Sequence, residues 1–367
     1  MKLRSKAITL LLLLLVAACS PPEPIKLGFL AGLTGRNADI GLAGRNGALL
    51  AVEQANAKGG IHGRPVELLL RDDEQRAEAA TAAVEQLAAA NVEAVIGPML
   101  STVALAVLPV AEKRGMVMVS PTVTATELSG KDDLFFKVVS TTRVNTKRSA
   151  EAQYARGLRR IAVAYDLSNR AYTTDWLRDF RQAFEKLGGQ VVATAEFTSG
   201  QASGYAEVVR GLGQTRPDGL LFIANAVDVV QLIQQARKQN LGQPIIGVTW
   251  AATEQLLELG GRTVEGFHVT QFFNREDTSP RYLAFREAYR ARFNQEPGFA
   301  TVASYDATQA TLEALSRRTP EQNLKQALLA SGPYQGLQEQ WNFDRYGDAE
   351  RKAYVTEVRN GRFVVVE

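Results

Sequence analysis

The feature that most constrains the fold of this chain is an alternation of two kinds of segment. Short apolar runs rich in Val, Ile and Leu alternate with longer stretches whose apolar residues recur at helical spacing. Continuous apolar strands separated by helices are typical of parallel sheets that carry helices on both faces. Strands are predicted at residues 25–30, 66–70, 94–96, 116–119, 160–164, 190–195, 219–223, 245–248 and 267–270. Helices are predicted between them at residues 41–58, 76–90, 102–113, 148–157, 174–187 and 227–239.

This alternation occurs twice along the chain. It runs to about residue 141 and starts again near Arg160, and each half has the size of one domain. We therefore predict an α/β fold made of two Rossmann-like lobes with parallel sheets. The pattern then changes, and helices are predicted at 280–294, 301–317 and 321–330. A β-meander is predicted for the remaining tail, with turns at 344–348 and at Asn360-Gly361, a dipeptide typical of hairpins.

The first eighteen residues have the pattern of a secretory signal peptide. Three basic residues precede an uninterrupted apolar run, residues 10–18, which is too short for a membrane-spanning helix. The run ends in Val-Ala-Ala-Cys, which resembles the bacterial lipobox, a motif whose cysteine is acylated and becomes the new N-terminus. We predict lipidation at Cys19, with residues 19–24 as lipidated N-terminus and stiff spacer. The alternative is an ordinary signal peptide that is cleaved after Ala-x-Ala.

Removal of residues 1–18 changes the charge of the chain. The precursor has 42 basic and 39 acidic residues, and three of the basic ones lie in the signal. The mature chain therefore has equal numbers of both, and we predict no nucleic-acid partner. Cys19 is the one cysteine of the sequence, so we expect neither a disulfide nor a cysteine metal site.

Residue patterns typical of enzymes are scarce. The chain has two histidines, His62 in a Gly-rich turn and His268 in an apolar strand, and no residue with the spacing of a nucleophile lies near either. The sequence has no nucleophile elbow, Walker loop or His-Glu-x-x-His motif. The segment Asp-Arg-Tyr-Gly-Asp at 344–348 is too short for a calcium loop. We predict that the chain is not an enzyme and has no cofactor or resident metal.

Small hydroxyl residues follow two of the predicted strands. Ser101 and Thr102 lie where a helix begins after the strand at 94–96, and Ser120, Thr122 and Thr124 follow the strand at 116–119. Ligands of open α/β sheets bind outside the carboxyl ends of the strands, and helix N-termini favour carboxylates. The alternatives are a simple helix cap at Ser101 and an ordinary Ser/Thr-rich turn at the second segment.

The order and spacing of the longest motifs resemble one family. "NAKGGIHGRPVEL" followed by "DD", then "VIGPMLSTVALAVLPVAEKRGMVMVSPTVTATEL", and later "ASYDATQATLEAL" and "FDRYGD" resemble the branched-chain amino-acid-binding group of the type I periplasmic binding proteins. The resemblance implies a clamshell that captures a small ligand between its lobes and delivers it to a membrane ABC permease. Lobe 1 would comprise residues 25–141 and 273–330. Lobe 2 would comprise residues 142–272 and 331–367.

The resemblance also implies site residues. Ser101 would hold the ligand carboxylate, and Thr122 and Thr124 would bind the α-carboxylate and α-ammonium groups. Thr102 is predicted as a further ligand contact from its position at the same helix start. Tyr172 matches an aromatic residue that closes from the second lobe.

Two positions depart from the family pattern. Asn225 replaces a second-lobe tyrosine, and it is equally placed to cap the helix that follows. Thr249 replaces the acidic residue that pairs with the ammonium group, beside Trp250, which would suit an aromatic or acyl ligand. Another acid, Asp166 or Asp228, could substitute, or the ligand is not an α-amino acid, since a buried ammonium without a carboxylate partner is costly.

Two functions of different classes follow from these observations. The first is a lipid-anchored receptor for an amino acid or a related carboxylate or amide, on the periplasmic face of a bacterial membrane. The second is a regulatory or scaffold lipoprotein of the envelope that uses the clamshell to bind a protein. Ser20 is not the aspartate that retains lipoproteins in the inner membrane, so either membrane is possible.

Overall fold

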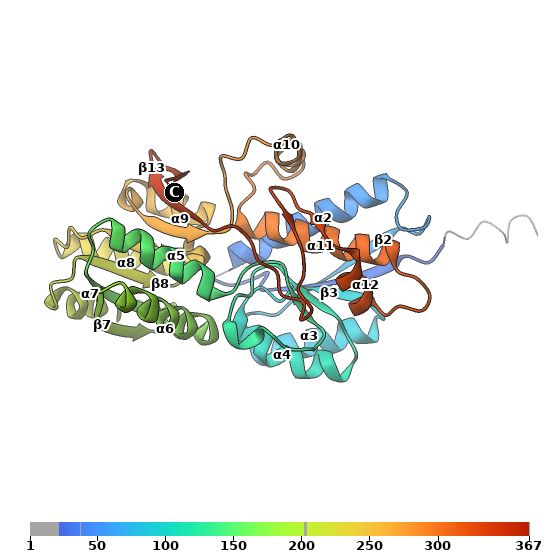
Figure 1. Ribbon diagram of the computed structural model, residues 1–367, viewed down its shortest axis with the longest axis horizontal. Helices are drawn as coiled ribbons and strands as arrows, with labels where there is room; N and C mark the ends of the chain where they lie inside the picture. Colours follow the sequence, from blue (N-terminus) through green and yellow to red (C-terminus); the bar gives the residue numbers. More distant parts are fainter. Residues whose placement is uncertain (1–21, 37, 202–203, 367) are drawn as a thin grey trace, which may run out of the picture.

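The computed structural model describes residues 22–36, 38–201 and 204–366. Two α/β lobes lie side by side along the long axis of the molecule (Figure 1). Each lobe has its own sheet. Strands β1–β5 belong to one sheet, and strands β6–β10 belong to the other. The prediction of two parallel α/β lobes is therefore confirmed. The predicted signal, Cys19 and Ser20 lie outside the described residues.

The first lobe contains a five-stranded sheet in the order β2-β1-β3-β4-β5. All of its pairings are parallel. The strands are β1 (Ile25–Ala31), β2 (Val66–Asp72), β3 (Ala94–Ile96), β4 (Met118–Ser120) and β5 (Phe135–Lys137). One face is covered by α2 (Ala38–Ala57) and α11 (Phe299–Arg317), and the other by α3 (Ala77–Ala89) and α4 (Ser101–Lys113) (Figure 1). Two further helices, α10 (Pro280–Phe293) and α12 (Leu324–Ser331), complete this lobe.

A glycine allows the close approach of α2 and α11. A Cβ atom at Gly47 would lie 2.2 Å from the backbone oxygen of Thr301, so any other residue would push these two helices apart. This contact matters for the site, because it fixes the N-terminal end of α11 at Phe299 beside the start of α2.

The second lobe contains a seven-stranded sheet in the order β14-β13-β10-β9-β8-β6-β7. Its parallel part is formed by β6 (Arg160–Asp166), β7 (Gln190–Phe197), β8 (Gly219–Ile223), β9 (Ile245–Val248) and β10 (His268–Gln271). An antiparallel hairpin of β13 (Tyr354–Arg359) and β14 (Arg362–Val365) extends it beyond β10. The helices are α5 (Thr142–Ala155), α6 (Arg170–Lys186), α7 (Tyr205–Gln214), α8 (Ala226–Lys238) and α9 (Glu254–Gly260).

The chain passes between the lobes after β5, after β10 and before β13. The last passage comes later than predicted, so the assignment of all residues 331–367 to the second lobe is wrong. The short hairpin of β11 (Tyr334–Gln335) and β12 (Gln340–Trp341) packs on the first lobe, where Phe343 meets Phe136 at a ring distance of 5.0 Å. These aromatic side chains have their apolar partners in the first lobe, and the tail therefore returns to the second lobe only with β13.

The tail is thus not one continuous meander, because β11 and β12 form a sheet of their own. The hairpin at Asn360-Gly361 is present, with both residues in the left-handed region (φ 52° and 69°). None of the helices in the described part of the chain is long and apolar enough to cross a membrane.

Candidate functional site

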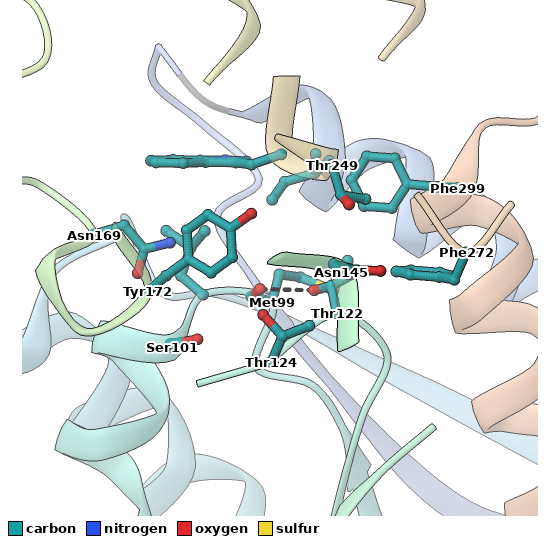
Figure 2. Close-up of a pocket in the computed structure, with 13 residues that line it drawn as sticks. Met99, Ser101, Thr122, Thr124, Asn145, Asn169, Tyr172, Thr249, Phe272 and Phe299 are labelled. Carbon is teal, nitrogen blue, oxygen red and sulfur yellow. Dashed lines mark hydrogen bonds between the residues drawn. The ribbon is translucent and has the colours of Figure 1, made fainter. Parts of the chain in front are cut away.

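A cavity of about 400 Å³, including its opening to solvent, lies between the two lobes. This is the size range of small-molecule sites, roughly 300–1,000 Å³. The first lobe contributes Ile40, Met99, Leu100, Ser101, Thr122, Thr124 and Phe299. The second lobe and its connections contribute Asn145, Asn169, Tyr172, Thr249, Trp250 and Phe272. Figure 2 shows these side chains arranged around a common space.

The first-lobe side of the cavity is built by the loops that follow β3 and β4. Gly97 turns the chain sharply after β3, at φ +124°, where a Cβ atom would lie 2.2 Å from the backbone oxygen of Leu30. The hydroxyl of Ser120 donates to the backbone oxygen of Pro98 (2.7 Å), and that of Thr122 donates to Met99 (2.6 Å; Figure 2). These bonds hold the two loops together and consume both hydroxyl protons.

Thr124 differs from its two neighbours. Its side chain is only 5% exposed, yet its Oγ1 atom has no hydrogen-bond partner. A buried hydroxyl without a partner costs about 1–3 kcal/mol. This atom therefore favours a ligand that supplies the missing bond.

The start of α4 adds donors at the same place. Ser101 is the first residue of this helix, and the preceding Leu100 provides no side-chain cap. One N–H group at this end, that of Thr102, is bonded to Asn169, and the partial positive charge of the helix N-terminus favours an anion beside it. This end of the cavity therefore suits a carboxylate.

Two aromatic residues form the second-lobe wall. Tyr172 extends from the first turn of α6, and Trp250 lies in a short 3-10 helix after β9, with the rings edge to face at 6.0 Å. Burial raises the pKa of the Tyr172 phenol, so this group is neutral at physiological pH. Trp250 is 5% exposed, and its Nε1 atom, which can only donate, has no partner. The wall therefore offers an apolar surface and one free donor.

The sequence did not point to several other lining residues. Asn145 on α5 is 4% exposed and has an unpartnered Oδ1 atom. Asn169 lies after β6 and directly before α6, just as Ser101 follows β3 at the start of α4. The rule that ligands bind at the carboxyl ends of strands could therefore have found it. Phe272 and Phe299, whose rings meet edge to face at 5.9 Å, come from a connection between the lobes and from the start of α11. Figure 2 shows them opposite Tyr172.

Six of the eight residues predicted as ligand contacts line this cavity: Ser101, Thr122, Thr124, Tyr172, Thr249 and Trp250. The other two do not. Asn225 caps α8, because its Oδ1 atom accepts from the backbone N–H of Asp228 (3.0 Å). Asn225 therefore has the alternative role considered from the sequence, that of a helix cap, and it is not among the residues that line the cavity.

Thr102 is occupied by a contact between the lobes. Its backbone N–H donates to Asn169 Oδ1 (3.2 Å), and its Oγ1 atom accepts from the backbone N–H of Ala171 (3.1 Å). The residue therefore joins α4 to α6, and it does not face the cavity.

The two acids considered as ammonium partners also lie elsewhere. Asp166 accepts bonds from Ser168 and from the backbone N–H of Ser199 (2.9 Å). Asp228 accepts from Arg36 (2.8 Å) and Tyr205 (2.5 Å). Among the described residues that line the cavity, none is acidic or basic. Neither acid therefore substitutes for one at Thr249, whose hydroxyl donates to the backbone oxygen of Thr270 (2.8 Å).

His268 is a packed strand residue. It is buried on β10, and its Nε2 atom lies 3.6 Å from Glu357 on the neighbouring strand β13. Burial, with a smaller contribution from Arg156, lowers its pKa to about 4. Within the described ranges, no group of three or more His, Cys, Asp or Glu side chains is arranged to hold a metal ion.

Known proteins resemble this chain over most of its length. A family model described as periplasmic binding protein matches residues 24–362. The Leu/Ile/Val-binding protein of Escherichia coli is 25% identical over 299 residues, which cover 80% of this chain and 80% of that protein. The leucine-specific-binding protein of Salmonella typhimurium is 24% identical over 322 residues, which cover 86% of each chain.

Solved structures share the same fold. A branched-chain amino acid transporter substrate-binding protein from Streptococcus pneumoniae, in complex with isoleucine, has a TM-score of 0.86 at 24% identity, covering 94% of this chain and 99% of its own. A solute-binding protein of an ABC transporter from R. palustris, in complex with benzoate, has a TM-score of 0.85 at 18% identity. It covers 94% of this chain and 95% of its own. At these identities the likeness shows the fold alone.

Proposed function

Because this chain belongs to the periplasmic binding protein family, we propose that it is a lipid-anchored receptor that captures a small carboxylate-bearing solute between its two lobes. An amino acid or a related carboxylate or amide is the ligand class. The relatives named above bind leucine, isoleucine and valine, and similar structures hold isoleucine or benzoate. The fold thus accommodates both amino acids and aromatic acids.

One observation carries this proposal. Three buried polar atoms without hydrogen-bond partners, on Thr124, Asn145 and Trp250, line one cavity between the lobes. Each such atom costs free energy in the empty protein. A ligand that bonds to all three offsets that cost, and an interface for a protein partner would not need them inside a cavity between the lobes. The receptor is therefore preferred to the scaffold.

Ligand binding would stabilise the closed arrangement of the lobes. Contacts across the gap already include the ion pair of Arg36 with Asp228 and the bonds of Thr102 with Asn169 and Ala171. A ligand that touches both lobes binds the closed state more tightly and shifts the population toward it. A shift from mostly open to mostly closed requires about 5.5 kcal/mol of differential affinity.

The remaining parts of the proposal concern location and delivery. Acylated Cys19 would hold the receptor at the periplasmic face of a membrane, and the closed form would deliver its ligand to an ABC permease. Mass spectrometry of the protein extracted from membranes tests the anchor. We expect lipid on Cys19 as the N-terminal residue and release of a Cys19→Ala variant from the membrane. An unmodified N-terminus that begins elsewhere would contradict the anchor and leave the receptor function intact.

A thermal-shift screen of the purified protein tests ligand capture. The panel should contain amino acids, branched and aromatic carboxylates, and amides. A ligand at a hundred times its dissociation constant adds about 2.7 kcal/mol of stability, which is a readily measured shift. We expect at least one member to raise the melting temperature, and the Ser101→Ala/Thr124→Ala double variant to lose this rise. No shift across the panel, together with stoichiometric recovery of a partner protein, would favour the scaffold instead.

A further inference from the structure

The described residues that line the cavity between the lobes are all uncharged, and this limits the class of ligand that the cavity can bind. We infer that the ligand is a carboxylate with a branched or aromatic hydrocarbon body and no ammonium group. This inference rests on the proposed receptor function and specifies its ligand class. It follows from the residues that line the cavity, from the lining atoms that lack hydrogen-bond partners, and from the positions of the nearby carboxylates.

The carboxylate has donors at one end of the cavity. Ser101 begins α4, so the ligand anion would lie at the positive end of this helix. The free Nε1–H of Trp250 and the unpartnered hydroxyl of Thr124 line the same space. Both side chains are more than nine-tenths buried, so they cannot obtain these bonds from bulk water. Several N–H and O–H donors at a helix N-terminus bind an anion without a basic side chain.

An ammonium group has no comparable partner. Among the described lining residues, the acceptors are the neutral oxygens of side chains such as Asn145 and Thr249. These oxygens can accept hydrogen bonds, but they do not compensate a positive charge that has left water. The same positive helix end that favours a carboxylate repels an ammonium placed beside it.

The three carboxylates considered as ammonium partners are absent from the lining of the cavity. The carboxylate of Asp166 accepts bonds from Ser168 and Ser199, and that of Asp228 accepts from Tyr205 and from Arg36 of the first lobe. Asp39, next to Ile40, lines a neighbouring groove that shares Ile40 and Phe299 with the cavity, and its Oδ2 atom is buried without a hydrogen-bond partner. Burial raises the pKa of this carboxyl. None of the described residues that line the cavity itself is therefore an acid that could pair with an α-ammonium group.

The rest of the cavity accommodates a hydrocarbon body. The rings of Tyr172, Trp250, Phe272 and Phe299 line it from two sides, and Figure 2 shows the phenylalanines facing the tyrosine. Apolar walls of this kind reward a branched or aromatic group by burying its surface. The free Oδ1 atom of Asn145 adds one neutral acceptor, which a hydroxyl on the ligand could satisfy.

Matched ligands test this inference by isothermal titration calorimetry on the purified protein. L-leucine is compared with 4-methylpentanoate and 2-hydroxy-4-methylpentanoate, and L-phenylalanine with 3-phenylpropionate. The members of each set share a carboxylate and a hydrocarbon body, and they differ in the ammonium group. We expect at least one acid to bind at least about 100-fold more tightly than its amino acid. An amino acid that binds as tightly as its acids, or more tightly, would overturn the inference and support the receptor function.

A charge placed in the cavity provides a second measurement. Thr249→Glu should raise the affinity for the amino acid at least about tenfold and lower that for the acid, because it adds a carboxylate to the neutral wall. Thr249→Gln is the neutral control and should not improve amino-acid binding. If Thr249→Glu does not fold, the wild-type comparison alone decides. If neither the amino acids nor the acids bind the wild type, this result overturns both the inference and the proposed function as a receptor for such ligands.

Discussion

The guanidinium group of Arg36 in the first lobe binds the carboxylate of Asp228 in the second, with Nη2 2.8 Å and Nε 3.2 Å from the same oxygen. Asp228 is fully buried at the start of α8, and it also accepts from Tyr205 and Asn225. The carboxylate is thus also held by two partners within the second lobe. This pair therefore joins the two lobes in this structure.

Loss of this contact should weaken ligand binding. In Arg36→Ala, Asp228 keeps its bonds to Tyr205 and Asn225, so the second lobe should remain folded. Arg36 is half-exposed, and exposed ion pairs contribute only about 1 kcal/mol, so we expect affinity to fall about three- to tenfold. Calorimetry measures this change. Arg292→Ala, which removes an ion pair to Glu53 within the first lobe, is the control and should leave affinity unchanged.

The unpartnered hydroxyl of Thr124 should contribute to binding and not to stability. Thr124→Val keeps the shape of the side chain and removes the hydroxyl. We expect affinity to fall about tenfold, because a bond worth about 1–1.5 kcal/mol is lost, while the free protein is unchanged or slightly more stable. Thr311→Val is the matched control, since Thr311 is buried on α11 with its hydroxyl bonded to Ala307. A thermal melt with and without ligand measures both effects, and equal affinity in Thr124→Val would contradict this role.

The indole N–H of Trp250 should act in the same way. Trp250→Phe retains an aromatic wall but removes the donor, so we expect about a tenfold loss of carboxylate affinity. Trp341→Phe is the matched control. Trp341 is also buried with an unpartnered Nε1 atom, but it lies away from the cavity, in the part of the tail that packs on the first lobe. Calorimetry should show the loss only in the first variant. The same loss in both would mean that the effect reaches the cavity through stability.

His268 should make the fold sensitive to acid. Its pKa is lowered by burial from 6.5 to about 4, so between these values the unfolded chain binds a proton that the folded chain does not. Stability from this group is present above pH 6.5 and is lost as pH falls toward 4. Between about pH 7 and about pH 4.5, the free energy of unfolding should fall in both proteins. The fall should be about 2 kcal/mol smaller in His268→Gln than in the wild type. Urea denaturation measures this, and the exposed His62 provides the control variant, His62→Gln. Parallel pH profiles of wild type and His268→Gln would contradict it.

Most strands of the sheets were predictable from sequence because they are buried on both faces. β8 (Gly219–Ile223), for example, is wholly buried and appears as an uninterrupted apolar run. β5 gave no such signal: it has three residues, and one of them is Lys137, whose ammonium is buried in an ion pair with Asp348 at 3.1 Å. That pairing depends on the tail, more than 200 positions away, so local pattern could not reveal it.

The cavity was predictable in part for similar reasons. Ser101 and Thr124 follow strands directly, and the rule that ligands bind at strand ends pointed to them. Asn145 was missed because α5 buries polar residues such as Thr142 and Ser149 near the crossing between lobes, so its first two turns lack an apolar period. Asn225 also follows a strand, and the same rule pointed to it, but its side chain accepts a hydrogen bond from the backbone of the helix that follows it.

A crystal structure of the purified protein with the strongest ligand from the screen tests most directly whether the cavity between the lobes is the binding site. We predict that the ligand is enclosed between Ser101 and Thr124 of the first lobe and Trp250 of the second, with its carboxylate at the start of α4. A ligand bound outside this cavity, or one that touches a single lobe, would contradict the proposed site.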